Sequence, residues 1–133
     1  MERIDYPVKV FVYGTLKREG SNHDVMVRAD GRFLCNAKTK ELRKLIVSGL
    51  PYLCDGHAPD GFHVEGEIFE VPDDSGLGML DTLEGNGHFY LRRLDDFTEC
   101  DSRKEHTAWV YYIMRDMDGE PQRSFDLDRS RKA

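Results

Sequence analysis

The sequence predicts an α+β fold: a small, mainly antiparallel or mixed β-sheet with a few short flanking helices. Segments with the apolar or alternating pattern of strands outnumber the helical segments, which are short. Strands and helices do not alternate in the βαβ order that builds a parallel sheet. We expect one domain over residues 1–133, with its core at about 8–114 and a polar tail at about 118–133. Closure of the sheet into a barrel is compatible with this pattern.

The first half of the chain predicts four strands and one short helix. Residues 8–13 are mostly apolar, as in a buried strand, and a loop follows at 14–20. Asn22 is the expected N-cap of a helix that ends at Ala29, with Val25 and Met26 on its inner side. The next strands are expected at residues 32–39, at 42–47 and, after a turn at 49–51, at 52–54.

The second half predicts one helix among three strands. Residues 55–61 hold two glycines and a proline and form a loop, after which residues 63–71 alternate like a strand. Pro72 and the polar residues after it offer a break and N-caps for a helix over 76–84. Its leucines recur at every third position, and Gly85 is placed as its C-cap. The final strands are expected at residues 88–97 and 106–114.

Charge and composition describe a globular chain without an evident nucleic-acid or membrane partner. The formal net charge of −6 argues against phosphate binding as the main function. No apolar stretch is long enough to cross a bilayer, and the first residues hold no apolar signal core. One basic cluster lies in the polar tail, where we expect it to be solvated. Its members are Arg123, Arg129, Arg131 and Lys132.

The cysteines and histidines predict neither a disulfide framework nor a metal site. An odd number of thiols, Cys35, Cys54 and Cys100, favours reduced cysteines and a cytoplasmic protein. The five histidines lack metal-ligand spacing; His57 and His63 could join Cys54, but a fourth ligand is missing. No phosphate loop, dinucleotide fingerprint or nucleophile elbow is present, so we expect no cofactor.

The segment Tyr13-Gly14-Thr15-Leu16 is the first candidate for a functional site. Gly14 interrupts a buried strand, which leaves backbone N–H groups and the Thr15 hydroxyl as possible donors to a carboxylate or an oxyanion. Gly14 would then allow a ligand to approach the backbone closely. A plain strand-ending turn explains the same residues and is favoured when they are taken alone.

Glu84, at the expected C-terminus of the second helix, is the candidate base. Most such residues are solvated. However, the partial negative charge of the helix end and burial by Phe89 and Tyr90 would raise the pKa of this carboxyl. A raised pKa improves a general base near neutral pH.

Other candidates could complete this site. Tyr90 and Arg92 share one face of a strand, and Tyr13 and Tyr111 could present hydroxyls to the same cavity. Core packing is the alternative for each aromatic residue. The glycine-containing segment 85–87 could be a small lid or an ordinary loop.

Three ordered motifs give the chain a family resemblance over about residues 8–114. It resembles the γ-glutamylcyclotransferase superfamily, also called AIG2-like, and most of all its γ-glutamylamine cyclotransferase branch. The first motif runs over residues 10–18 and continues at Asn22-His23. The second covers residues 64–71. The third is Leu80-Asp81-Thr82-Leu83-Glu84-Gly85 followed by Tyr90-Leu91-Arg92, and the resemblance extends to Trp109-Val110-Tyr111.

This resemblance implies a compact β-barrel and conversion of a γ-glutamyl amide, such as γ-glutamyl-lysine, to 5-oxoproline and a free amine. Glu84 would be the general base, and the backbone of residues 13–16 would hold the glutamyl group. Tyr90, Arg92 and Tyr111 would join substrate binding. No cofactor, metal or nucleic acid would be needed, and no oligomeric state is implied.

One departure from the family pattern concerns the leaving amine. The family often has proline between Glu84-Gly85 and Tyr90, where this chain has residues 86–89, Asn-Gly-His-Phe. This change would alter the leaving-group pocket. Two alternatives to a γ-glutamylamine cyclotransferase remain: an enzyme that tailors a γ-glutamyl-protected metabolite, and a ligand-binding or interaction module that has kept the fold.

Overall fold

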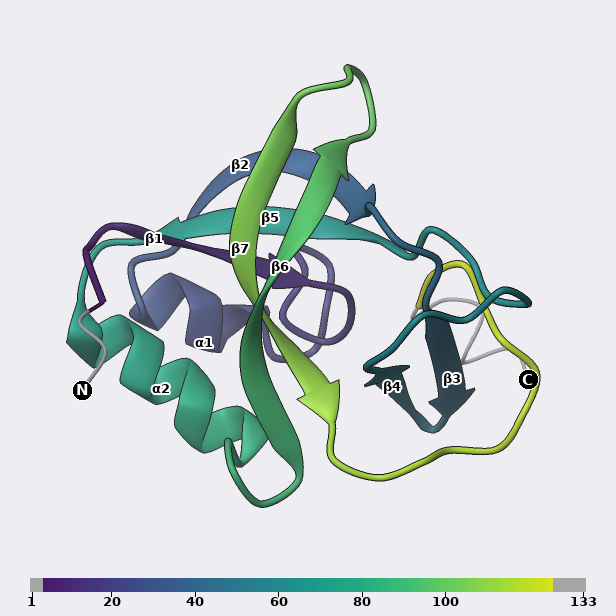
Figure 1. The fold of residues 1–133 in the computed structure, drawn as a ribbon. Helices are drawn as coiled ribbons and strands as arrows, with labels where there is room; N and C mark the ends of the chain where they lie inside the picture. The colour runs from purple at the N-terminus through teal and green to yellow at the C-terminus, as the bar shows by residue number, and fades with distance from the viewer. Residues whose placement is uncertain (1–3, 126–133) are drawn as a thin grey trace.

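The computed structural model describes residues 4–125, which form seven strands and two α-helices (Figure 1). In chain order these elements are β1 (Val8–Val12), α1 (His23–Arg28), β2 (Arg32–Thr39), β3 (Lys44–Ser48), β4 (Leu50–Cys54), β5 (Glu65–Val71), α2 (Asp74–Glu84), β6 (Tyr90–Glu99) and β7 (Glu105–Ile113).

Five of these strands close into a barrel in the order β1-β5-β2-β6-β7. Neighbouring strands in this order run antiparallel, and the barrel is closed by a parallel contact between β1 and β7, where Val10 pairs with Trp109. The β3–β4 hairpin extends the sheet from β7 through a parallel pairing of Cys54 with Ile113. The predicted α+β fold with a mixed, closed sheet is therefore confirmed.

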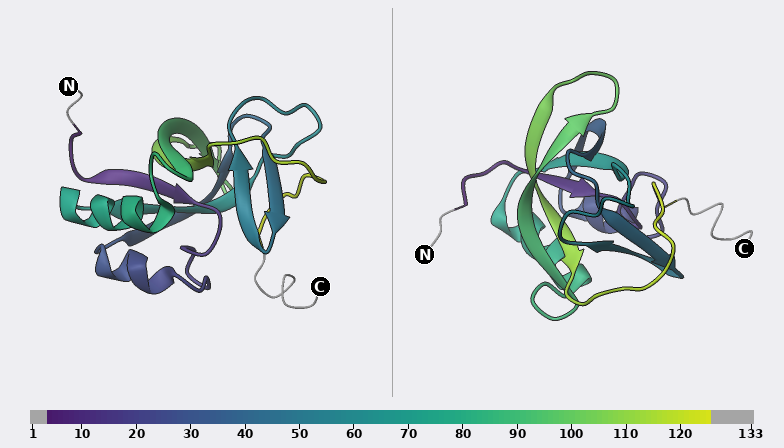
Figure 2. Two further views of the ribbon diagram at one scale, coloured as in Figure 1. Left: turned by 90° about the horizontal axis from the view of Figure 1, so that it is seen from below. Right: turned by 45° about the vertical axis from the view of Figure 1, so that its right-hand side comes forward.

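The core lies on both faces of β1, because successive side chains of a strand point in opposite directions. Val10 and its alternate neighbours contact a cluster that includes Met26 of α1 and Leu80 of α2. Phe11 belongs to a second cluster, built from strand and loop residues. Both helices lie next to each other on one side of the barrel (Figures 1 and 2). The prediction that the first strand is buried is confirmed.

Several element boundaries differ from the predictions for identifiable reasons. α2 begins at Asp74, because Asp73 caps it by accepting a hydrogen bond from the Gly76 N–H at 2.9 Å. Gly85 ends the helix in the left-handed conformation at φ 61°, as predicted. β4 begins two residues earlier than predicted because Gly49, at φ 76°, makes the turn alone and places Pro51 in the strand.

The chain after β7 is only partly solvated. The Gln122 N–H donates to the Leu45 carbonyl at 2.8 Å, and the Arg123 carbonyl accepts from the Glu65 N–H at 2.9 Å. Phe125 is buried. The side chains of Gln122 and Arg123 are exposed, in agreement with the predicted solvation of the basic cluster at Arg123. The backbone of both residues nevertheless completes hydrogen bonds of β3 and of the barrel, and the burial of Phe125 was not predicted. The remaining basic residues, Arg129, Arg131 and Lys132, lie outside the described residues.

Two further observations concern the described part of the chain. None of its helices has the length and apolar character needed to span a bilayer. Its three cysteines are free thiols.

Candidate active site

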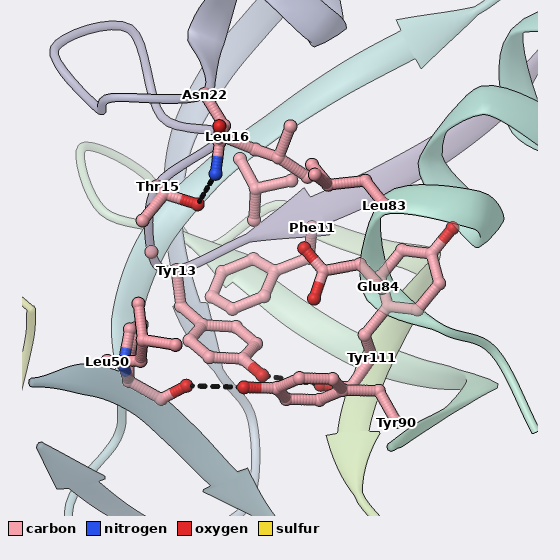
Figure 3. Close-up of a pocket in the computed structure, with 13 residues that line it drawn as sticks. Phe11, Tyr13, Thr15, Leu16, Asn22, Leu50, Leu83, Glu84, Tyr90 and Tyr111 are labelled. Carbon is pink, nitrogen blue, oxygen red and sulfur yellow. Dashed lines mark hydrogen bonds between the residues drawn. The ribbon is translucent and has the colours of Figure 1, made fainter. Parts of the chain in front are cut away.

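A cavity of about 140 Å³ lies where β1 ends, between α2, β4 and the barrel (Figure 3). Seven of the eight predicted site residues line it. They are Tyr13, Gly14, Thr15, Leu16, Glu84, Tyr90 and Tyr111. Segments far apart in the sequence meet here because the barrel closes between β1 and β7.

Residues Tyr13-Gly14-Thr15-Leu16, the strand-end segment, supply unused backbone donors. The Gly14 carbonyl accepts from the Lys17 N–H at 3.1 Å, which folds residues 14–17 into a turn. Within residues 4–125, the N–H groups of Thr15 and Leu16 donate to no other group. The Thr15 hydroxyl oxygen accepts from the Asn22 side-chain amide at 3.0 Å, so its proton remains available for a ligand.

Gly14 is required by protein packing. A Cβ atom at this position would lie 2.5 Å from Cγ of Pro51, which is too close for two carbon atoms. The strand-end segment therefore packs directly against β4. The predicted reason for this glycine, close approach of a ligand, is joined by a steric reason that the sequence did not reveal.

Glu84 is the last residue of α2, and its side chain points into the cavity (Figure 3). Burial raises the pKa of its carboxyl from 4.5 to about 7. The predicted direction of the pKa change is thus confirmed, with desolvation as its cause. Of the two predicted neighbours, Tyr90 lines this cavity together with Glu84, whereas Phe89 is 71% exposed and lies outside it.

Two tyrosines in the cavity have hydroxyls that donate to backbone carbonyls. The Tyr13 hydroxyl donates to the Tyr111 carbonyl at 2.5 Å, and the Tyr90 hydroxyl donates to the Pro51 carbonyl at 2.9 Å. Burial, followed by the charge of Glu84, raises the pKa of Tyr90. With its proton committed, the Tyr90 hydroxyl can offer only an acceptor oxygen to a ligand, for example to an ammonium group. The Tyr13 oxygen is already hydrogen-bonded to the backbone of Leu53.

Arg92 does not line the cavity, in contrast to its predicted role. It binds the Asp81 carboxylate and lies over the Trp109 ring at 4.7 Å. Asp81 also accepts a hydrogen bond from the Tyr111 hydroxyl at 2.7 Å. Arg92 therefore reaches the cavity indirectly, by holding the residue that orients Tyr111.

Sequence reasoning did not assign six lining residues to this cavity: Phe11, Val12, Asn22, Leu50, Pro51 and Leu83. Asn22 was expected to cap α1, but its side chain makes no capping hydrogen bond and binds Thr15 instead. Its position in the Asn22-His23 motif was the available signal. Leu50 and Pro51 were assigned to a turn, and nothing local in the sequence indicates that β4 faces the end of β1.

The segment after Glu84 is an ordered turn. The N–H groups of Asn86, Gly87 and His88 donate to carbonyls at 3.0, 2.8 and 2.8 Å, and the Phe89 carbonyl accepts from the Met114 N–H at 3.0 Å. Gly87 adopts a left-handed φ of 91°. These hydrogen bonds favour the ordinary-loop interpretation over a loose lid.

One group of possible metal ligands occurs in the described chain, outside the cavity. Ligand atoms of Cys35, Glu99 and His106 lie within 4.8 Å of one another. However, Nδ1 of His106 lies 2.9 Å from Nζ of Lys9, and its Nε2 lies 2.7 Å from Glu99. An ammonium at Nδ1 places the ring proton on Nε2, from which it is donated to Glu99, so His106 links Lys9 to Glu99 in a chain of hydrogen bonds. Cys54, His57 and His63 form no such group within residues 4–125.

A closed barrel whose cavity joins a carboxylate of raised pKa to backbone donors is the kind of site used for proton transfer at a carbonyl group. Comparison with known proteins identifies the family. The protein-family model described as gamma-glutamyl cyclotransferase, AIG2-like, matches residues 10–129 of the sequence. The chain therefore belongs to this family of cyclotransferase enzymes.

Curated relatives and a solved structure agree with this assignment. Gamma-glutamylaminecyclotransferase of Mus musculus is 33% identical over 120 residues, which cover 84% of this chain and 69% of the relative. Gamma-L-glutamyl-butirosin B gamma-glutamyl cyclotransferase of Niallia circulans is 34% identical over 113 residues, 80% of this chain and 67% of the relative. The crystal structure of an AIG2-like protein from Mus musculus superposes with a TM-score of 0.81 at 27% identity, covering 92% of this chain and 90% of that one.

Proposed function

We propose that this chain is a γ-glutamylamine cyclotransferase that converts a γ-glutamyl amide to 5-oxoproline and a free amine, with Glu84 as general base. The observation that carries the proposal is that Glu84, with a pKa of about 7, and the strand-end segment line the same small cavity. γ-Glutamyl-lysine is one candidate substrate. The similarity to gamma-glutamylaminecyclotransferase of Mus musculus supports the amine-releasing class.

The first step of the proposed reaction is proton transfer to Glu84. The ionised carboxylate accepts a proton from the α-ammonium group of the substrate, which leaves a neutral amine. That nitrogen attacks the γ-carbonyl carbon of the same molecule and closes a five-membered ring. Because nucleophile and electrophile belong to one molecule, the enzyme mainly holds the chain of the substrate in its reactive conformation.

The second step is collapse of the tetrahedral intermediate. The oxyanion and the substrate carboxylate are anionic, and the unused N–H groups of Thr15 and Leu16 are the donors suited to them. The bond from the carbonyl carbon to the leaving nitrogen then breaks, and the proton held by Glu84 passes to that nitrogen. The ring nitrogen gives up its second proton through Glu84 to the released amine, so the products are the neutral lactam 5-oxoproline and an ammonium ion. The carboxylate of Glu84 is regenerated, and the proposed reaction balances in atoms and charges without a cofactor.

An assay of 5-oxoproline release from a panel of γ-glutamyl amides tests this function. We expect wild type to release 5-oxoproline and Glu84→Gln to lose roughly 10²-fold or more in kcat, the usual contribution of a general base. Glu70→Gln is the matched control, because Glu70 lies on β5 and pairs with Arg32 at 3.0 Å, outside the cavity. Equal turnover by Glu84→Gln and wild type would exclude the proposed base. Ligand binding without turnover would favour the binding-module alternative.

A further inference from the structure

We propose that a second hollow, outside Glu84, receives the leaving amine and selects amines with an apolar body over amines with a second positive charge. This inference rests on the proposed function, and it concerns which γ-glutamyl amides are used. The second hollow has a volume of about 590 Å³. Its apolar lining includes Leu50, Leu83, Phe89 and Met114.

Glu84 lies at the junction of the two spaces. Leu50, Leu83, Glu84 and Tyr90 line both the small cavity and the second hollow. In the proposed reaction Glu84 serves the attacking nitrogen first and the leaving nitrogen afterwards. A γ-glutamyl group in the small cavity therefore directs its amine substituent past Glu84 into the second hollow.

The surface of the second hollow is unusually apolar for an exposed region. Seven large hydrophobic side chains are exposed within residues 4–125, and four of them gather here. Their exposed fractions are 52% for Leu50, 39% for Leu83, 71% for Phe89 and 50% for Met114. Contiguous exposed apolar side chains mark binding sites, because their burial by a ligand is favourable.

The wall of the second hollow is formed before a ligand arrives. The Phe89 carbonyl accepts from the Met114 N–H at 3.0 Å, which ties the turn after α2 to the end of β7. The Tyr52 and Tyr90 rings are nearly parallel, at an interplanar angle of 5° and a centroid distance of 6.4 Å. An ordered wall with planar rings suits a hydrocarbon chain or an aromatic ring.

The charges of the lining disfavour a second cation. Among the described residues that form it, Arg115 is cationic and Glu84 is the one acid. Glu84 is already committed to the proton transfers. A diamine product would therefore place its distal ammonium against an apolar wall without a counter-charge, which costs free energy.

Five amides of γ-glutamate test this selectivity. The methylamide is expected to fill only the small cavity, and the phenethylamide adds an aromatic body. The pentylamide and the 4-aminobutylamide have similar length but differ by one charge. γ-Glutamyl-lysine is the fifth substrate. We expect kcat/KM for the phenethylamide to exceed that of the methylamide by roughly tenfold or more, since burial of a single methylene already strengthens binding by roughly fourfold. The pentylamide should exceed the 4-aminobutylamide. γ-Glutamyl-lysine, whose amine portion carries both an ammonium and a carboxylate, is the reference substrate of the proposed function.

Two exposed side chains provide the matching variants. Phe89→Ala and Met114→Ala should each lower kcat/KM for the phenethylamide by roughly fivefold and leave the methylamide within about twofold of wild type. Leu94→Ala is the control, because Leu94 is also exposed, at 56%, but lies on β6 outside the hollow. The methylamide serves as an internal measure of folding and of intact chemistry.

The outcomes separate the two proposals. Turnover of the methylamide with no preference for the phenethylamide, or an equal loss on both substrates in the variants, would overturn the apolar subsite and leave the cyclotransferase intact. A preference for the 4-aminobutylamide over the pentylamide would overturn the charge argument. Absence of turnover on all five amides would refute the proposed function and the subsite with it.

Discussion

Replacing Glu84 with glutamine is expected to stabilise the fold at alkaline pH while it abolishes proton transfer. Burial raises the pKa of Glu84 to about 7 in the folded chain, against 4.5 for an unburied glutamate. Between these values the folded state binds more protons than the unfolded state. The free energy of unfolding contributed by this residue therefore falls as pH rises from about 4.5 to about 7, and is constant above that range. Glutamine does not ionise, so the free energy of unfolding of the variant does not fall for this reason as pH rises.

The size of the effect follows from the two pKa values. Their separation of about 2.5 pH units, at about 1.36 kcal/mol per unit, corresponds to about 3 kcal/mol. The side chain is not wholly buried, so this figure is an upper bound. We expect the difference in unfolding free energy between Glu84→Gln and wild type to move in favour of the variant by between about 1 and 3 kcal/mol from pH 4 to pH 8.5.

Urea denaturation of both proteins at several pH values measures this difference. Other ionisable groups are shared by the two proteins, so their contributions cancel in the comparison. Glu70→Gln, which removes an exposed pair with Arg32, should show little dependence of its difference on pH. A difference for Glu84→Gln that does not change with pH would refute the argument that Glu84 is desolvated in the free enzyme.

Three more expectations concern packing, the support of the cavity and catalysis. Gly14→Ala should destabilise the fold by about 1–3 kcal/mol because its Cβ would clash with Pro51. Gly78 lies in α2, where an added Cβ would have no neighbour within 4 Å, so Gly78→Ala should stabilise the fold by about 0.5–1 kcal/mol. Urea midpoints of the two variants check both signs. Asp81→Asn should cost about 1–3 kcal/mol, because Arg92 loses its charged partner; a change below about 0.5 kcal/mol would contradict the role of this pair. A pH profile of kcat/KM should rise through about 7 as the free enzyme's carboxyl ionises, and a profile flat between pH 5 and 9 would exclude that carboxyl as the base.

The sequence predicted the elements of the fold well because each carries a local signal. Alternating and apolar runs marked the strands, and Gly85 marked the end of α2 through its left-handed conformation. The start of β4 was misplaced because Pro51 is disfavoured in most strands, while Gly49 alone was enough to make the turn. Barrel closure depends on the pairing of β1 with β7, which leaves no local pattern in either strand.

The candidate site was predictable where chemistry depends on residue type, and less so where it depends on long-range packing. Glu84 and the strand-end segment could be selected as a candidate base and a candidate set of donors before their proximity was known. Arg92 illustrates the limit: strand periodicity placed it on the same face as Tyr90, but Asp81 of α2 holds its guanidinium away from the cavity. Asn22 was assigned to a helix cap because asparagine is common at caps, but its side-chain amide binds Thr15 in the site instead.

The parallel contact between β1 and β7 also fixes when the site can form during synthesis. β1 leaves the ribosome first and β7 last, and Tyr111, which completes the cavity, belongs to β7. Until β7 arrives, one edge of β1 lacks its partner and is open to pairing with other chains. The donors and Glu84 are both present in such a nascent chain, yet the cavity is incomplete. Enzyme activity in this fold should therefore appear only after the last strand has docked, which makes turnover a direct reporter of completed folding.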